Sequence, residues 1–190
     1  MRAFRALFTL LASCVVMAAS SSEAGAYERQ WQVGLGVGYA QLINEGGTPV
    51  TPASLHGIGS SLTITYGLTD AINIIGHADF NAHPGDAPTL LYGGSVGVAY
   101  VIDVLRWVPW AGVTAGGYGV SALEPCVATN DVPCTNARLG FSLLGGIDYQ
   151  VSRSFSIGAM GRYGVLLFGN QNAVDHTIGG FIRAQYIWGY

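Results

Sequence analysis

The chain of 190 residues contains no lysine, and only 10% of its residues are charged. Its eight basic residues are all arginines, and they form no patch with interleaved aromatic residues. The sequence therefore gives no support to nucleic-acid binding, which depends on a clustered basic surface. Half of the residues are hydrophobic, and low charge combined with this apolar content points to a membrane protein.

A second absence is that of long hydrophobic runs. After residue 26, no stretch reaches the roughly 18 unbroken apolar residues that a spanning helix requires. In hydrocarbon, only helices and closed barrels satisfy their backbone hydrogen bonds, so the composition predicts a barrel. The 28 glycines favour the same structure, because glycine is costly inside helices but tolerated in strands that bend or crowd a narrow lumen.

Residues 1–26 are predicted to be a secretory signal peptide. Two arginines form its charged start, residues 7–19 form a short apolar core, and the Ala-Gly-Ala at 24–26 is a small-x-small cleavage site. A membrane anchor is the alternative, but the apolar run is too short for one. The mature chain, residues 27–190, is then expected to form a single barrel domain.

Only three cysteines are present. Cys14 lies within the predicted signal, in a stretch that resembles a lipoprotein cleavage box but comes too early in the chain. Cys126 and Cys134 remain after export to an oxidising compartment, so we expect a disulfide that closes a short loop. A metal-binding pair is the alternative, but no histidine or further cysteine lies nearby. No metal and no cofactor are therefore expected.

Eight segments of the mature chain alternate between apolar and polar residues with period two, as strands do. They cover residues 31–40, 57–68, 71–80, 91–101, 110–120, 137–150, 155–164 and 175–190. The fifth segment is so rich in glycine and alanine that its two faces cannot be assigned. The last segment is the most aromatic, with Tyr186, Trp188 and Tyr190 on its apolar face.

The connections between these segments alternate in length. Long connections at 41–56, 81–90, 121–136 and 165–175 are separated by shorter ones at 69–70, 102–108 and 151–154. This alternation predicts an all-β, eight-stranded antiparallel up-and-down transmembrane β-barrel with extracellular loops and periplasmic termini. The long connections carry an acidic rim without arginine, made of Glu45, Asp86, Glu124, Asp131 and Asp175.

Aromatic residues near the strand ends predict two interfacial girdles, and both Trp107 and Trp110 are assigned to them. A soluble sandwich or lipocalin-like barrel is the alternative. It would bury the apolar faces inward and leave the arginines and the glycine-rich faces in water.

A set of polar residues falls on the side of the strands opposite the apolar face. A charge facing lipid costs up to ~2–4 kcal/mol at the bilayer midplane, so we expect these residues to pair inside the lumen. A gated path for small solutes is the alternative. The predicted lumen network consists of His77, Asp79, Arg138, Asp148, Arg162, Arg183 and Gln185.

His77 and Asp79 could also form half of a hydrolytic dyad, for which Ser95 or Ser142 would have to supply the nucleophile. Ser95 lies in a G-x-S-x-G pattern, but the alternation continues through it, without the turn and helix that such a nucleophile needs. No catalytic residue is therefore predicted. The remaining histidines, His56, His83 and His176, are expected to be solvated in or beside the outer loops.

Taken together, residues 27–190 resemble the small eight-stranded outer-membrane β-barrel proteins, the OmpA-like barrel and OmpX-like group. The glycine-rich runs at 109–112 and 145–149 and the aromatic terminal residue Tyr190 carry this resemblance. It implies a Gram-negative outer membrane with its lipids as partners. It also implies that Tyr186, Trp188 and Tyr190 are read by the barrel-assembly machinery during insertion, although the usual last residue is phenylalanine.

These observations predict a non-enzymatic protein with a structural or surface-contact role and a lumen filled by the polar network. A narrow, porin-like channel for small solutes is the first alternative. A lipid-modifying enzyme of the outer membrane is the second. No ligand of the surface loops can be named from the sequence.

Overall fold

The computed structural model describes residues 28–44, 53–85, 88–102, 106–122, 135–167 and 174–189. The predicted signal peptide, the cysteine pair Cys126 and Cys134, and the last residue Tyr190 lie outside these described residues. Among the described residues, no helix has the length and apolarity needed to cross a membrane.

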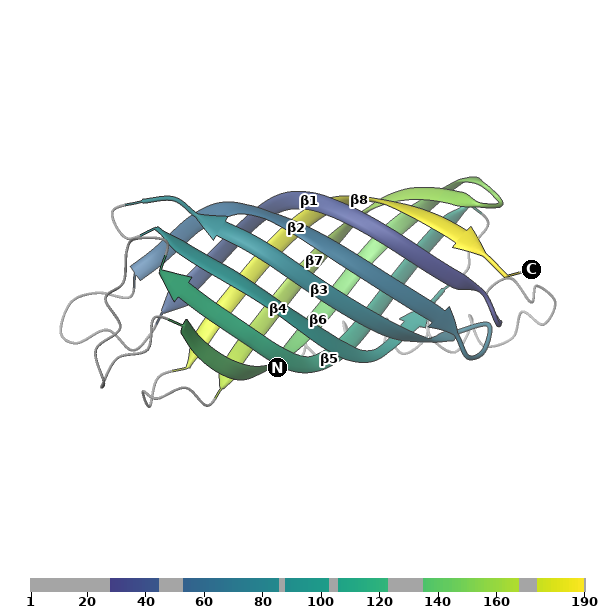
Figure 1. Cartoon of the computed structure of the whole chain (residues 1–190). Helices are drawn as coiled ribbons and strands as arrows, with labels where there is room; N and C mark the ends of the chain where they lie inside the picture. The colour runs from purple at the N-terminus through teal and green to yellow at the C-terminus, as the bar shows by residue number, and fades with distance from the viewer. Residues whose placement is uncertain are drawn as a thin grey trace, which may run out of the picture.

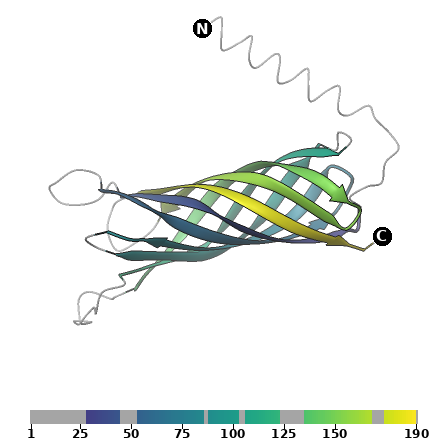
Figure 2. The same cartoon turned by 90° about the horizontal axis from the view of Figure 1, so that it is seen from above.

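Eight strands form one closed barrel in which every strand is antiparallel to the strands that follow and precede it, and β1 pairs with β8. The strands lie steeply inclined to the barrel axis (Figures 1 and 2). They are β1 (Trp31–Asn44), β2 (Ala53–Gly67), β3 (Ile72–His83), β4 (Thr89–Val101), β5 (Trp107–Ala122), β6 (Thr135–Ser152), β7 (Phe155–Leu167) and β8 (Asp175–Trp188). The predicted fold class is thereby confirmed.

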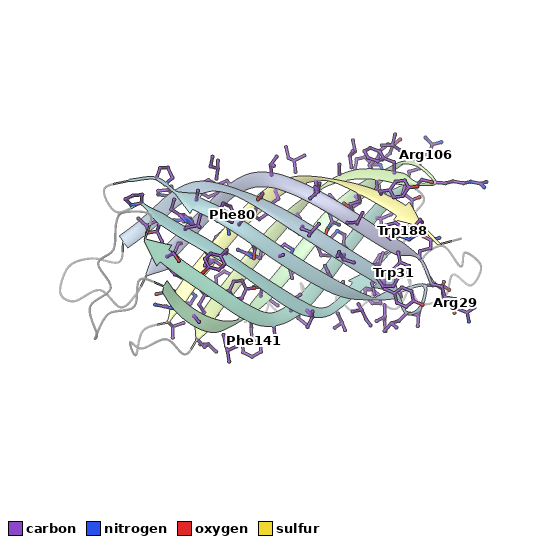
Figure 3. The ribbon with its side chains drawn as sticks, in the orientation of Figure 1. Arg29, Trp31, Phe80, Arg106, Phe141 and Trp188 are labelled. Atoms are coloured by element: carbon purple, nitrogen blue, oxygen red, sulfur yellow. The ribbon has the colours of Figure 1, made fainter. Side chains whose placement is uncertain are left out.

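Both the start of β1 and the end of β8 lie at one end of the barrel, where Trp31 pairs with Trp188. We call this the terminal end, and the opposite end, where β1 ends and β8 begins, the loop end. Trp31, Trp188, Arg29 and Arg106 all lie at the terminal end (Figure 3).

Apolar side chains cover the outside of the barrel, and charged side chains lie inside. On β8, Ile182 is 75% exposed whereas its neighbour Arg183 is 6% exposed. The same alternation runs along β1, where Leu35 is 69% exposed. Figure 3 shows Phe141 pointing away from the barrel wall. The period-two alternation thus separates the outer and lumenal faces of the strands as predicted, with the apolar face outward.

The strand β5 is where the sequence prediction was incomplete. It begins at Trp107 rather than at residue 110, so the predicted connection at 102–108 is too long. Pro109 lies within this strand, and its carbonyl oxygen accepts a hydrogen bond from the Ile102 amide at 2.9 Å. Because β4 ends at Val101, the missing N–H of the proline faces no strand residue and interrupts no ladder hydrogen bond.

The assignment of Trp110 to an aromatic girdle is wrong. Trp107 is 54% exposed and its ring lies 4.8 Å from that of Tyr149, but Trp110 is only 7% exposed and faces the lumen. The two residues are three positions apart on one strand, so their side chains must point to opposite faces.

The lumen is narrow enough to require glycine on some inward positions. A Cβ on Gly97 would collide with the Val113 carbonyl oxygen, and one on Gly38 would collide with that of Gly180. By contrast, a Cβ on the outward-facing Gly180 would meet no atom within 4 Å. Tight inward curvature, rather than turn geometry, explains the inward glycines.

Candidate functional site

The centre of the lumen holds an ion pair that spans the barrel. Arg162 of β7 donates through Nη1 to the Asp79 Oδ1 of β3, and these strands lie on opposite sides of the ring. His77 Nε2 lies 3.2 Å from the same carboxylate oxygen. All three side chains are at most 1% exposed. A pair of this kind ties two distant strands together through the interior.

A second ion pair lies nearer the terminal end. Arg183 of β8 donates Nε to Asp148 Oδ1 at 2.9 Å and Nη2 to Asp148 Oδ2, a bidentate contact with β6. The Arg183 Cζ also lies 4.3 Å from the centroid of the Trp110 ring. The planar guanidinium therefore satisfies a carboxylate in its plane and stacks on an indole with its face. Gln185 lies buried on the same strand.

A third ion pair lies near the loop end, where Arg138 of β6 donates to Asp175 of β8. The assignment of Asp175 to an exposed acidic rim is wrong, because this residue begins β8 and is 2% exposed. The solvated position expected for His83 is also wrong: the residue ends β3 and is fully buried. The strand β3 extends three residues further toward the loop end than predicted, whereas β8 begins at Asp175 as predicted and points this side chain into the lumen. The other four acidic rim residues lie outside the described part of the chain.

Apolar side chains pack around these ion pairs. One cluster combines residues from six strands: Ile75, Ala99, Val101, Val108, Trp110, Leu144, Met160 and Phe181. A smaller cluster toward the loop end joins Leu91, Tyr118 and Leu166. The larger cluster contains residues from opposite sides of the ring, such as Ile75 of β3 and Met160 of β7, so it crosses the lumen rather than lining it.

A hollow of about 30 Å³ remains beside the Arg183–Asp148 pair, toward the terminal end. Two polar atoms among its lining residues, Asn73 Oδ1 and Trp110 Nε1, have no hydrogen-bond partner within the described residues. The hollow has room for about two water molecules, which commonly satisfy buried polar atoms of this kind. It is too small for an organic substrate.

The residues considered for catalysis do not form a nucleophilic site. His77 and Ser95 are register partners on β3 and β4, but Ser95 Oγ donates to Thr114 Oγ1 at 3.2 Å. Ser142 Oγ instead lies 3.2 Å from the Tyr118 hydroxyl. Within the described residues, His77 Nδ1 has no partner, so no hydroxyl is activated by this imidazole. In the same part of the chain, no group of three His, Cys, Asp or Glu side chains could hold a metal.

Several buried lumen residues are missing from the predicted network: Asn73, Asn81, His83, Trp110, Tyr118 and Asp175. Strand parity places Asn73 on the inward face with His77 and Asp79, and the same parity continued past the predicted strand end would place Asn81 there. Trp110 and Tyr118 lie four positions on either side of Thr114, the one inward polar residue of β5, and share its parity. A single polar residue among glycines and alanines is too weak a signal to fix a face.

Two of the three predicted assembly residues, Tyr186 and Trp188, lie on the outside at the terminal end. The rings of Tyr186 and Trp188 stack at 5.8 Å, and Trp31, the register partner of Trp188, contacts Tyr66 at 4.8 Å between ring centroids. These residues form an aromatic belt over the β8–β1 seam, where the two ends of the chain close the barrel.

An eight-stranded up-and-down barrel with an apolar outside and ion pairs inside is the fold of the small outer-membrane barrels. Among solved structures, Neisserial surface protein A matches with a TM-score of 0.59 and 14% identity over 80% of this chain and 95% of that one. Ail, the attachment invasion locus protein of Yersinia pestis, matches with a TM-score of 0.52 and 14% identity over 85% of this chain and 99% of that one. These likenesses show the fold. No protein-family model and no curated protein sequence matches the chain.

Proposed function

We propose that the protein is an integral barrel of a Gram-negative outer membrane that acts as a structural or surface-contact element and does not conduct solutes. Its terminal end faces the periplasm and its loop end the exterior. The inverted side-chain pattern supports the location: large apolar residues cover the outside, whereas each charged residue of the lumen has a partner. A monomeric soluble protein rarely exposes so continuous an apolar surface to water.

The main support for a closed lumen is that buried ion pairs and apolar clusters fill it. Three ion pairs and two apolar clusters together fill the lumen, and the clusters pack around the ion pairs. A conducting pathway would have to displace both a buried ion pair and a packed apolar layer. Eight strands leave an interior that side chains can fill.

Single-channel recording in planar bilayers tests this proposal. We expect no steady conductance from the purified barrel, with a known large porin as the positive control for fusion. Inserted protein is quantified in the same preparation by its resistance to protease. Steady, uniform steps from fully inserted protein would refute the closed lumen and favour a narrow channel.

The surface-contact role rests on the loop end. The names of both structural neighbours, a surface protein and an attachment protein, support this role, and Ail has been crystallised with the heparin analogue sucrose octasulfate. The strongest candidate surface is the loop between Cys126 and Cys134, because a cross-linked loop loses less entropy on binding. Alkylation with and without reductant, followed by mass spectrometry, tests the disulfide. Deleting residues 127–133 should abolish binding to sulfated glycans or host cells if this loop is the contact surface.

Insertion is proposed to depend on the aromatic terminal strand. Replacing Tyr186, Trp188 and Tyr190 by alanine should lower the amount of folded barrel in outer membranes, measured by the shift in gel mobility between heated and unheated samples. Unassisted refolding of the same variant into detergent should be less affected. Equal loss in both assays would indicate a stability defect instead of a lost assembly signal.

A further inference from the structure

The outward face of β5 and β6 carries an arginine and two aromatic rings at the terminal end. Arg106 directly precedes β5, is exposed, and lies at this end in Figure 3. Its guanidinium donates a hydrogen bond to the Tyr149 hydroxyl. Trp107 is the register partner of Tyr149, and their ring centroids are 4.8 Å apart. The three side chains, which we call the Arg106 cluster, thus form one connected group on the outside of the barrel.

Apolar residues continue from the Arg106 cluster toward the middle of the barrel. Two residues further along β5, Pro109 pairs with Ile147 of β6, which is exposed. Ile157 of β7, the register partner of Tyr149, is exposed as well. From the terminal end inward, the surface therefore changes from a cation to aromatic rings and then to aliphatic side chains. A phospholipid changes in the same order, from phosphate through the glycerol region to acyl chains, and Trp and Tyr are enriched at the depth between.

The hydrogen bond between Arg106 and Tyr149 gives the cluster two kinds of donor for an anion. A guanidinium has five N–H donors and no acceptor, so the bond to the tyrosine oxygen leaves Arg106 with further donors. The tyrosine accepts that bond and can still donate its own O–H. Phosphate oxygens carry negative charge and accept several hydrogen bonds, so N–H and O–H donors side by side suit a phosphate group.

An equivalent group on the opposite side of the ring differs in its charge. Arg29 precedes β1, and Trp31 contacts Tyr66 of β2 with the same centroid distance of 4.8 Å. The Arg29 Nε, however, lies 3.8 Å from Glu28 Oε1, and Asp70 lies in the turn that follows β2. Among the described residues, the two carboxylates outside the lumen are therefore on this β1–β2 side. The Arg106 cluster, on the β5–β6 side, is better suited to an anion.

We propose that the Arg106 cluster binds the phosphate of an anionic phospholipid in the inner leaflet, with the glycerol region against Trp107 and an acyl chain over Pro109 and Ile147. The inference rests on the proposed membrane function, because the terminal end meets the inner leaflet only when the barrel is inserted in that orientation. The phosphate accepts hydrogen bonds from the guanidinium and from the Tyr149 hydroxyl. The β1–β2 counterpart has no such preference, because carboxylates lie beside its arginine.

The test uses the full mature chain, refolded into phosphatidylcholine nanodiscs that contain a small fraction of phosphatidylglycerol. Native mass spectrometry after release from the disc measures how much phosphatidylglycerol stays bound relative to phosphatidylcholine. We expect the wild-type chain to retain phosphatidylglycerol preferentially. Arg106→Gln should lower this preference about tenfold, the effect of losing a charge-assisted hydrogen bond. Tyr149→Phe should lower it about threefold, because the arginine remains.

Matched control variants come from the β1–β2 counterpart. Arg29→Gln and Tyr66→Phe remove the same chemical groups from the opposite side of the ring and should leave the lipid preference unchanged. Asp103 precedes Arg106 in the same connection and lies outside the described residues. Asp103→Asn removes a negative charge from this connection and should not lower the preference. Millimolar inorganic phosphate should not displace the lipid, because it lacks the acyl chains.

An unchanged lipid preference in Arg106→Gln would overturn the inference. An equal loss in Arg29→Gln would do so as well, since it would indicate attraction to the overall charge of the terminal end rather than a site. Displacement of the lipid by inorganic phosphate would indicate a soluble-anion site. Binding to isolated peptidoglycan sacculi that depends on Arg106, without any lipid preference, would assign the cluster to a different anionic partner.

Protease protection of the nanodisc sample is measured in parallel for every variant, so that a failure to fold is separated from a loss of lipid binding. If the wild-type chain fails to insert, the proposed membrane function fails. If it inserts without lipid preference, only this inference fails.

Discussion

Replacing Arg162 by methionine is the most direct test of the cross-lumen ion pair. The substitution keeps an apolar side chain of similar length but leaves the Asp79 carboxylate at 1% exposure without its cation. Removing one partner of a buried ion pair typically costs about 3–5 kcal/mol. His77 still contacts the same carboxylate at 3.2 Å, so we expect a loss of about 3 kcal/mol, at the lower end of this range.

The matched double variant Asp79→Leu/Arg162→Met removes both charges. Because it leaves no uncompensated charge, it should lie within about 1 kcal/mol of the wild type. Stability is measured by reversible urea unfolding in detergent micelles, followed by tryptophan fluorescence and by gel mobility. The single variants Asp79→Leu and Arg162→Met are measured alongside. If each lowers the free energy of unfolding by less than about 1 kcal/mol, or if their effects simply add in the double variant, the carboxylate and the guanidinium are not coupled and the reasoning is refuted.

Three further tests, with five substitutions in all, probe other features of the barrel. Trp110→Phe keeps a ring under Arg183 and removes an Nε1–H that has no partner within the described residues. The free energy of unfolding, measured in urea, should therefore change by less than about 1 kcal/mol, whereas Trp110→Ala should lower it by about 3–5 kcal/mol. Gly97→Ala should prevent closure of the barrel, because its Cβ meets the Val113 carbonyl, while Gly180→Ala should refold normally; gel mobility after refolding distinguishes them. Ile182→Arg places a charge at an outward position that is 75% exposed and should cost about 2–4 kcal/mol, and a smaller loss would place this residue outside the hydrocarbon.

The sequence was sufficient for the fold because the alternation of faces is strong on seven of the eight strands. Ile182 and Arg183 are adjacent in the chain, and period two alone sends one to lipid and the other to the lumen. On β5, glycine and alanine occupy both faces, so the two faces of this strand cannot be distinguished by their hydrophobicity. The alternation therefore gives no correct face for Trp110, and it leaves Pro109 outside the predicted strand although a proline can lie near a strand start.

Pairing inside the lumen could not be obtained from the sequence. Period two shows that Asp79 and Arg162 point inward, but their meeting depends on the register of all the strands between β3 and β7. Asp175 shows the same limit, because whether a residue ends a loop or begins a strand depends on how far the ladder continues. The Trp107–Tyr149 contact likewise follows from cross-strand register rather than from spacing along the chain.

The balance of charge inside the barrel bears on what the lumen can do. Arg138, Arg162 and Arg183 are each matched by an aspartate, so the described lumen has no excess of either sign. Pores that select ions use rings of one sign, whose field attracts the permeating species. A neutral, internally paired lumen attracts neither cations nor anions. Each ion pair links two strands through the interior and leaves no charge free to bind a solute. Contacts with a partner are therefore expected on the outward face of this barrel and at its loop end, from which the long connections leave.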